Sequence, residues 1–389
     1  MRLQKARSLL LGLAALIAAT KLAAAGDEPH ASIRGTVDGV IRPMMAKDGI
    51  PGAAVAVIAD GSVSLFNYGV ASKETHQPVT RNTLFEIGSV TKTFTATLAS
   101  WAQVDGRLEW SDEIANHVPS LRESPFGKVS LLALATHTPG GIPLQVPGEI
   151  TTDDQLMQYL EKWRPVYPPG TRRTYSNVGI GMLGLAVARS WGEPFTALME
   201  QRLFPALGMK NSFVDLPAAK MRDYAQGYSE AGAPVRMSPG MLWSQTYGVR
   251  STATDLARFI EANMGVIQLD GRLQRAITQT HTGYFEAGPM TQDLVWEQYP
   301  YPVGLAALLS GNSARMIFEP NPVEAITPPQ EPQGDTWINK TGSTNGFGAY
   351  VAFVPAKRLG IVVLANKSFP IADRVTAAYR VLTTLAKEN

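Results

Sequence analysis

The chain has 389 residues, more than a usual single domain, so we expect one large domain or two interleaved domains. Hydrophobic residues make up 45% of it and charged residues 17%, which is typical of a globular protein and excludes a disordered or coiled one. The absence of cysteine excludes disulfides, thiolate metal sites and cysteine nucleophiles, and a formal net charge of +2 excludes a strongly basic or acidic protein.

Residues 1–25 have the three parts of a secretory signal peptide. A basic start precedes an apolar run over residues 8–19, and three alanines end the segment at Ala25. The apolar run is short for a membrane span, but Lys21 lies close to the expected cleavage point and leaves a retained anchor as the alternative. We expect a mature chain that begins near Gly26 in a bacterial periplasm. Cleavage removes four basic residues, so the formal charge becomes −2 and no nucleic acid or membrane is expected as a partner.

Three elements are predicted near the start of the mature chain. Apolar residues recur at helical spacing over residues 32–47, which predicts an amphipathic helix. Residues 52–58 and 62–70 are rich in β-branched and aromatic residues and are joined by Asp60-Gly61, a strong signal for a tight hairpin. The helix is therefore expected to precede two adjacent antiparallel strands.

The stretch at residues 85–92 carries the first candidate functional residues. Gly88 permits a sharp turn into a helix, and Ser89 would lie in its first turn, where free backbone N–H groups favour developing negative charge. Lys92 follows at position i+3, on the same helix face. An apolar stripe follows until Asp105-Gly106, so the helix should be anchored in a core. Taken alone, the motif is also consistent with a serine N-cap and a solvated lysine.

The middle of the chain is less regular. Residues 108–316 mix short helical patterns with long connections that contain proline and glycine, which indicates a mostly helical region with functional loops. β-Strand patterns then resume, and a helical pattern closes the chain. The predicted elements are strands at residues 336–341, 348–354 and 359–365, and a helix at residues 372–387.

The order of these elements predicts the fold class. Helix, two strands, a helical insertion, three strands and a helix are consistent with an α/β fold of the α+β type, in which both chain ends build one antiparallel sheet flanked by helices. An all-helical domain is inserted into this arrangement. We therefore expect residues 26–84 and 317–389 to form an α/β sandwich domain, and residues 85–316 to form a mostly helical domain.

Two later stretches complete a set of three motifs. Tyr175-Ser176-Asn177 follows a turn that contains two prolines and a glycine, and Lys340-Thr341-Gly342 lies on a predicted strand. Ser-x-x-Lys, Tyr-x-Asn and Lys-Thr-Gly in this order resemble the active-site signature of the serine penicillin-recognising enzymes. Any one motif is weak evidence, whereas three motifs in the correct order, each in a plausible element, are strong evidence.

The tyrosine of the second motif resembles class C β-lactamases, and the likeness runs through most of the mature chain. The closely matching stretches are residues 84–89, 140–145 and 339–348. The resemblance implies a β-lactamase/transpeptidase-like fold, with the site between the α/β sandwich domain and the helical domain. It also implies a periplasmic monomer that hydrolyses β-lactam antibiotics, especially cephalosporins, through an acyl-enzyme.

The three motifs are chemically consistent with a serine nucleophile. A serine hydroxyl is a poor nucleophile until a neighbouring group takes its proton. Lys92 and Tyr175 are both within plausible reach of Ser89, so either residue is a candidate base. Lys340 adds positive charge, which would favour a phenolate and lower the pKa of Tyr175.

The resemblance also implies residues that would bind the substrate. The backbone N–H groups of Ser89 and Ser343 would form the oxyanion hole. Gln145 and Asn177 would hydrogen-bond the amide side chain of the antibiotic, and Tyr247 would pack against that side chain.

Recognition of the substrate carboxylate departs from the family pattern. The family often has asparagines near the positions of Ser368 and Ile371, and this chain does not. The residues left to bind the carboxylate are Lys340, Thr341 and Ser343, with Arg374 as a further candidate.

We expect neither a metal nor a cofactor, because the five histidines are scattered singly and show no metal-ligand spacing. Two other functions remain open. The first is a peptidase acting on D-Ala-D-Ala peptides, or an esterase, on the same scaffold with the same motifs. The second is a β-lactam sensor, which is acylated and then signals. The speed of deacylation distinguishes a lactamase from a peptidase, since a peptidase stays acylated.

Overall fold

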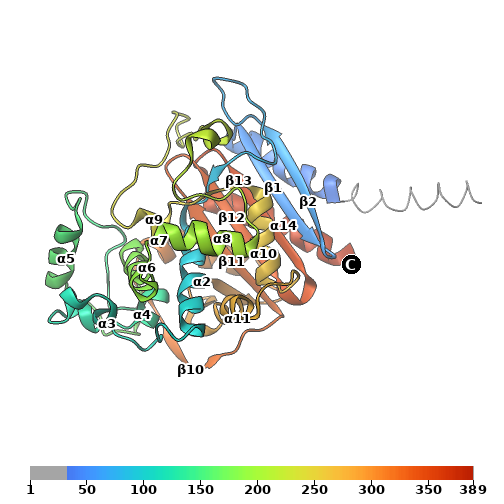
Figure 1. The fold of residues 1–389 in the computed structure, drawn as a ribbon. Coiled ribbons are helices and arrows are strands. Elements are labelled where there is room, and N and C mark those ends of the chain that lie inside the picture. The colour runs from blue at the N-terminus through green and yellow to red at the C-terminus, as the bar shows by residue number, and fades with distance from the viewer. Residues whose placement is uncertain (1–32, 389) are drawn as a thin grey trace, which may run out of the picture.

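The computed structural model describes residues 33–388, so the expected signal peptide lies outside the described residues. The centre of the molecule is a nine-stranded sheet in which all neighbouring strands are antiparallel (Figure 1). In their order across the sheet, the strands are β10 (Glu324–Gln330), β6 (Gly283–Ala287), β7 (Met290–Gln292), β8 (Glu297–Pro300), β11 (Thr336–Ser343), β12 (Gly348–Val354), β13 (Leu359–Ala365), β1 (Gly52–Ala59) and β2 (Ser62–Gly69). Two short strand pairs are β3 (Phe85–Glu86) with β5 (Arg250–Ser251), and β4 (Arg172–Arg173) with β9 (Asn321–Pro322).

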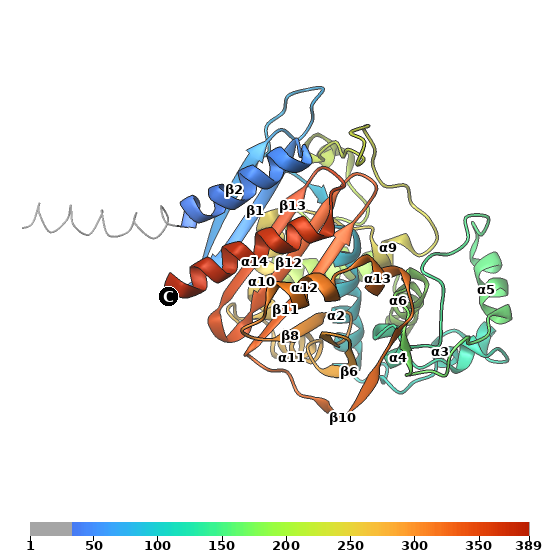
Figure 2. The same cartoon turned by 180° about the vertical axis from the view of Figure 1, so that it is seen from behind.

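Helices cover both faces of the sheet (Figure 2). They are a helix over residues 33–48, α2 (Thr91–Val104), α10 (Ala253–Asn263), α11 (Gly271–Gln279), α12 (Leu305–Gly311) and α14 (Ile371–Glu388). On one face, the first helix, α12 and α14 share a core that includes Ile41 and Val375. On the other face, α2, α10 and α11 share a second core that includes Phe94 and Leu98. The sheet therefore lies between two hydrophobic layers.

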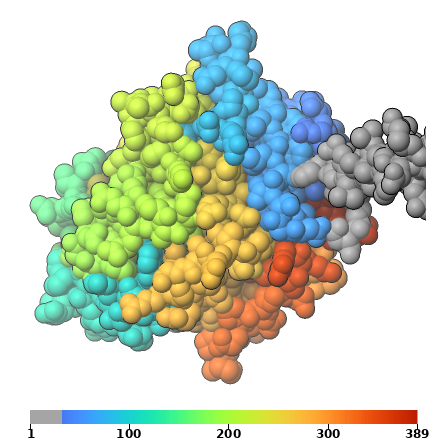
Figure 3. Space-filling view, turned by 45° about the vertical axis from the view of Figure 1, so that its right-hand side comes forward, coloured from blue at the N-terminus to red at the C-terminus, as the bar shows by residue number. Residues whose placement is uncertain are grey.

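Further helices complete the molecule. They are α3 (Ile114–His117), α4 (Leu131–Ala135), α5 (Asp153–Lys162), α6 (Asn177–Trp191), α7 (Phe195–Ala197), α8 (Phe204–Leu207), α9 (Trp243–Thr246) and α13 (Ala314–Phe318). α3 to α6 lie at the end of the molecule farthest from the β1–β2 hairpin. Figure 3 shows the blue and red segments from the two chain ends together on one side, and the cyan and green segments on the other. None of the helices within residues 33–388 is long and apolar enough to cross a lipid bilayer.

The predicted elements at both chain ends are confirmed. Asp60 and Gly61 connect β1 to β2 with positive φ angles of 50° and 75°, as a tight hairpin turn requires. β11, β12, β13 and α14 lie within about two residues of their expected bounds. β1, β12 and β13 are buried at every residue, because helices cover both faces of the sheet at these strands. The fold class predicted from the order of elements is confirmed as well.

The sequence analysis missed four strands of the sheet, which are β10 at one edge and β6, β7 and β8 beside it. β6, β7 and β8 lie within residues 283–300, in the stretch expected to be mostly helical, and they join the sheet beside β11. These strands have only three to five residues, and polar side chains such as Gln292 and Glu297 face the interior. A short strand that buries polar residues lacks the alternation by which strands are recognised. A domain boundary at residue 316 would therefore assign β6, β7 and β8 to one domain and the other six strands of the same sheet to the other.

Candidate active site

A close backbone contact joins the Ser89 motif to β11. Residues 88–90 form a short 3-10 helix before α2, and a Cβ atom at Gly88 would lie 2.5 Å from the backbone nitrogen of Ser343. A Cβ atom at Gly342 would lie 2.0 Å from the backbone oxygen of Ile87 and 3.1 Å from the backbone nitrogen of Ser89. Only glycine at both positions permits this approach. The contact therefore places the backbone nitrogens of Ser89 and Ser343 close to each other.

If the chain acts on β-lactams as the sequence resemblance implies, substitution of Gly342 by alanine should reduce kcat/KM by at least about 10-fold. The methyl group would push β11 away from Ile87 and displace the backbone N–H of Ser343, a candidate oxyanion donor. Initial rates with nitrocefin, a chromogenic cephalosporin, measure the effect. Gly304→Ala is the matched control, since a Cβ atom there has no neighbour within 4 Å. Equal rates for Gly342→Ala and the control would contradict the role of this contact.

Lys92 lies beside the serine hydroxyl. Its ammonium donates hydrogen bonds to Oγ of Ser89 at 2.8 Å and to the backbone oxygen of Thr246 at 3.0 Å. The side chain is fully buried. Burial lowers the pKa of Lys92 from 10.5 to about 8; the charge of Lys340 acts in the same direction, and Tyr175 opposes both. Lys92 therefore holds its proton less tightly than a free lysine does, and it lies within hydrogen-bond distance of Ser89.

Tyr175 lies among three cations. The centre of its ring is 5.2 Å from Nζ of Lys92, 5.1 Å from Nζ of Lys340 and 5.4 Å from Cζ of Arg173. Burial raises the pKa of the phenol, but the charges of Lys340 and Lys92 and the hydroxyl of Ser89 outweigh burial and lower this pKa from 10.0 to about 8. The phenol is therefore a stronger acid here than a free tyrosine.

The segment around Tyr175 is held by side chain to backbone hydrogen bonds. Ser176 caps α6, where its Oγ accepts a hydrogen bond from the backbone N–H of Gly179 at 3.0 Å and donates one to the backbone oxygen of Pro143 at 2.6 Å. The backbone N–H of Ser176 donates to Nδ1 of His137 at 3.2 Å, and the His137 ring lies 4.5 Å from the Tyr175 ring. Burial and the neighbouring cations hold the pKa of His137 well below its usual value, so this imidazole is neutral.

A cavity of about 850 Å³ opens above these residues and contains most of the expected binding groups. The expected residues that line it are Ser89, Gln145, Tyr175, Asn177, Tyr247, Lys340, Thr341 and Ser343. Oδ1 of Asn177 is buried without a hydrogen-bond partner among the described residues, so its capacity to accept a hydrogen bond is unused. Ile371 also lines the cavity and presents an apolar side chain there.

Arg374 lies behind the cavity wall rather than in it. Its side chain is 1% exposed, and it donates hydrogen bonds to the backbone oxygen of Gly342 at 2.6 Å and to Oγ of Ser343 at 3.1 Å. A third hydrogen bond goes to the backbone oxygen of Phe369. Burial lowers the pKa of Arg374 to about 9. Arg374 therefore holds the end of β11 and the Ser343 hydroxyl, and its direct binding of a substrate carboxylate stays a prediction.

Sequence reasoning missed a further group of residues that line the cavity. Arg173, Glu297 and Asn312 are polar and buried, and Met316 and Phe318 add apolar surface. Arg173 lies two residues before Tyr175, but nothing in the sequence relates it to Glu297, 124 residues later. Within residues 33–388, no group of three or more His, Asp or Glu side chains is placed to hold a metal ion.

Comparisons with known proteins agree with this geometry. The β-lactamase family model matches residues 37–386. A β-lactamase from Pseudomonas fluorescens is 50% identical over 353 residues, which cover 91% of this chain and 99% of that protein. The crystal structure of a class C β-lactamase in complex with cefoxitin is 49% identical with a TM-score of 0.89, and the match covers 91% of this chain and 99% of that one. The crystal structure of D-alanine carboxypeptidase AmpC from Burkholderia cenocepacia is 57% identical with a TM-score of 0.88, over 91% of this chain and 99% of that one.

Proposed function

Because this chain belongs to the β-lactamase family and resembles its class C members in structure, we propose that it hydrolyses β-lactam antibiotics through an acyl-enzyme on Ser89. The observation that carries the proposal is the contact of 2.8 Å between Nζ of Lys92 and Oγ of Ser89, beside a tyrosine that lies between two lysines. This arrangement supplies a nucleophile and two candidate bases in one cavity.

Acylation begins when Oγ of Ser89 attacks the lactam carbonyl carbon and its proton passes to Lys92 or Tyr175. The carbonyl oxygen becomes an oxyanion, which the backbone N–H groups of Ser89 and Ser343 stabilise. The C–N bond of the lactam then breaks, and the phenol of Tyr175 donates a proton to the departing nitrogen. The product is an ester between Ser89 and the opened antibiotic.

Deacylation requires a water molecule that attacks this ester. The described residues near Ser89 leave Tyr175 as our first candidate base for that water, because Lys92 and Lys340 favour its phenolate. The departed lactam nitrogen would assist the tyrosine in this step. Attack transfers the acyl group from Ser89 to the water oxygen, and the serine hydroxyl recovers its proton.

We also infer which residues bind the substrate and where the enzyme is located. Gln145, Asn177 and Tyr247 line the cavity and would contact the amide side chain of the antibiotic. Thr341 and Ser343 would bind the substrate carboxylate. We infer a monomer that is exported to the periplasm, and the intact mass of the secreted protein, with a chain beginning near Gly26, tests the export.

Hydrolysis of nitrocefin by the purified mature protein tests the proposed function. We expect continuous turnover of many molecules per enzyme, in buffer with EDTA as well as without it, because serine chemistry needs no metal. The alternative is a D-alanine carboxypeptidase, which is how the Burkholderia cenocepacia relative is described. A burst of one equivalent followed by a stall, with release of D-alanine from D-Ala-D-Ala peptides, would favour the carboxypeptidase and contradict our proposal.

A further inference from the structure

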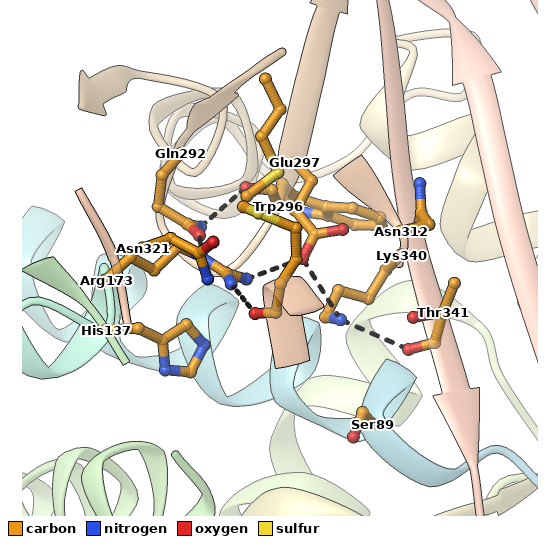
Figure 4. Close-up of polar contacts among 12 residues, drawn as sticks. Ser89, His137, Arg173, Gln292, Trp296, Glu297, Asn312, Asn321, Lys340 and Thr341 are labelled. Atoms are coloured by element: carbon orange, nitrogen blue, oxygen red, sulfur yellow. Dashed lines mark hydrogen bonds and ion pairs between the residues drawn. The ribbon is translucent and has the colours of Figure 1, made fainter. Parts of the chain in front are cut away.

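Three buried charged side chains beside Tyr175 contact one another, and Lys340 is one of them. Arg173 from β4, Glu297 from β8 and Lys340 from β11 are 1%, 4% and 2% exposed. The guanidinium of Arg173 donates to Oε1 of Glu297 at 2.9 Å, and Nζ of Lys340 lies 3.8 Å from the same oxygen. Figure 4 shows the Glu297 carboxylate between the two cations. One carboxylate oxygen therefore serves both cations.

Arg173 connects the Tyr175 segment to three separate parts of the chain. Its Nε donates to Gln292 at 2.5 Å, one terminal nitrogen donates to the backbone oxygen of Met316 at 2.7 Å, and the other donates to Glu297. β4 itself contains only two residues and pairs with the equally short β9. The planar guanidinium with its fixed donors therefore adds rigidity to this short pair, beyond the hydrogen bonds that Ser176 makes on the other side of Tyr175.

Glu297 is placed to hold the ammonium of Lys340. Besides this carboxylate, Nζ of Lys340 has a hydrogen bond of 3.3 Å to the backbone oxygen of Thr341. Without Glu297, the cluster around Tyr175 would consist of three buried cations that repel one another. A buried charge is tolerated when it is paired and hydrogen-bonded, so the carboxylate permits Arg173 and Lys340 to remain close to the tyrosine.

We propose that Arg173 and Glu297 are positioning residues for β-lactam turnover: Arg173 fixes the segment that carries Tyr175, and Glu297 fixes the ammonium of Lys340 beside it. The proposal rests on the proposed function of the cavity. Glu297 acts through Lys340, so its removal should change the electrostatic environment of Tyr175 as well as the rate.

Removal of the Glu297 charge should shift the pKa of Tyr175 in a defined direction, whereas a general loss of structure would not. The charged and titratable groups that face the Tyr175 ring are Lys92 from α2, Lys340 from β11, Arg173 from β4, Glu297 from β8 and His137 from the loop after α4. The negative charge of Glu297 raises the pKa of Tyr175, and the positive charge of Lys340 lowers it. Loss of the carboxylate should therefore lower this pKa further, whereas Lys340→Gln should raise it.

The test is Glu297→Gln in the full mature protein, because glutamine keeps the shape and removes the charge. We expect kcat for nitrocefin to fall by about 10-fold or more with a smaller change in KM, since the reacting groups are displaced. We also expect the Tyr175 pKa, followed by NMR of protein labelled with ¹³C in its tyrosine rings, to fall below that of the wild type. Glu193→Gln is the matched control, because Glu193 belongs to a half-exposed ion pair with Arg202 that does not line the cavity.

A second variant covers the case in which Glu297→Gln does not fold. Arg173→Lys keeps the positive charge, but one amine cannot reach all three partners of the guanidinium, so kcat should fall while the Tyr175 pKa stays close to that of the wild type. For Glu297→Gln, wild-type values of kcat and of the Tyr175 pKa would overturn the proposal, and so would a fall in kcat with an unchanged pKa in that variant. For Arg173→Lys, a wild-type kcat would overturn it. If wild-type protein does not turn over nitrocefin, the proposed function fails, and the Tyr175 titrations still test the role of Glu297.

Discussion

Replacement of Ser89 by alanine is expected to abolish covalent capture of β-lactams and to lower kcat for nitrocefin by about 10⁴-fold or more, the scale seen when a serine nucleophile is removed. Oγ of Ser89 is the atom that would form the ester, and neither Lys92 nor Tyr175 replaces it in that role. Mass spectrometry of protein incubated with cefoxitin measures the adduct, and initial rates measure the loss of turnover.

Ser111→Ala is the control for this experiment, since Ser111 is exposed and does not line the cavity. It should be acylated and should turn over nitrocefin as the wild type does. The Ser89→Ala variant removes one hydrogen-bond acceptor of Lys92, which keeps the backbone oxygen of Thr246 as a partner, so we expect it to fold. An adduct of unchanged mass on Ser89→Ala would exclude Ser89 as the nucleophile.

Removal of the phenolic oxygen in Tyr175→Phe is expected to slow acylation and deacylation together, each by about 10²-fold or more, the usual scale of positioned general acid–base catalysis. The ring keeps its packing against His137, so the change is confined to the proton-transfer group. Pre-steady-state mass spectrometry separates the two steps, because it follows the rise and the decay of the acyl-enzyme.

The matched control for this variant is Tyr159→Phe, which removes a phenolic oxygen from α5, outside the residues that line the cavity. Its rates should equal those of the wild type. If Tyr175→Phe is acylated at the normal rate and its adduct is hydrolysed normally, Tyr175 is not the base. Lys92, whose pKa burial lowers to about 8, would then be the better candidate.

Local sequence patterns determined much of the fold. The Asp60-Gly61 pair specifies its hairpin because both residues must adopt positive φ, and the continuous apolar runs of β12 and β13 specify strands that are covered on both faces. The three motifs also placed Ser89, Lys92, Tyr175 and Lys340 in one candidate site. Such signals lie within a few consecutive residues, so they can be read without knowledge of the rest of the chain.

Only the tertiary structure decided how β6, β7 and β8 join the sheet, since these strands bury polar side chains and depend on their neighbours for hydrogen bonds. The tertiary structure also placed Arg374 behind Ser343 rather than in the cavity.

By itself, the sequence predicted which residues would carry the chemistry: a serine, two lysines and a tyrosine in three ordered motifs. The tertiary structure alone decided what holds them, through the approach of Gly342 to Ile87 and the shared oxygen of Glu297 between Arg173 and Lys340. The physical reason is that such contacts join residues far apart in the chain. Their distances follow from the packing of whole elements and from the need to pair buried charges, which no local pattern records.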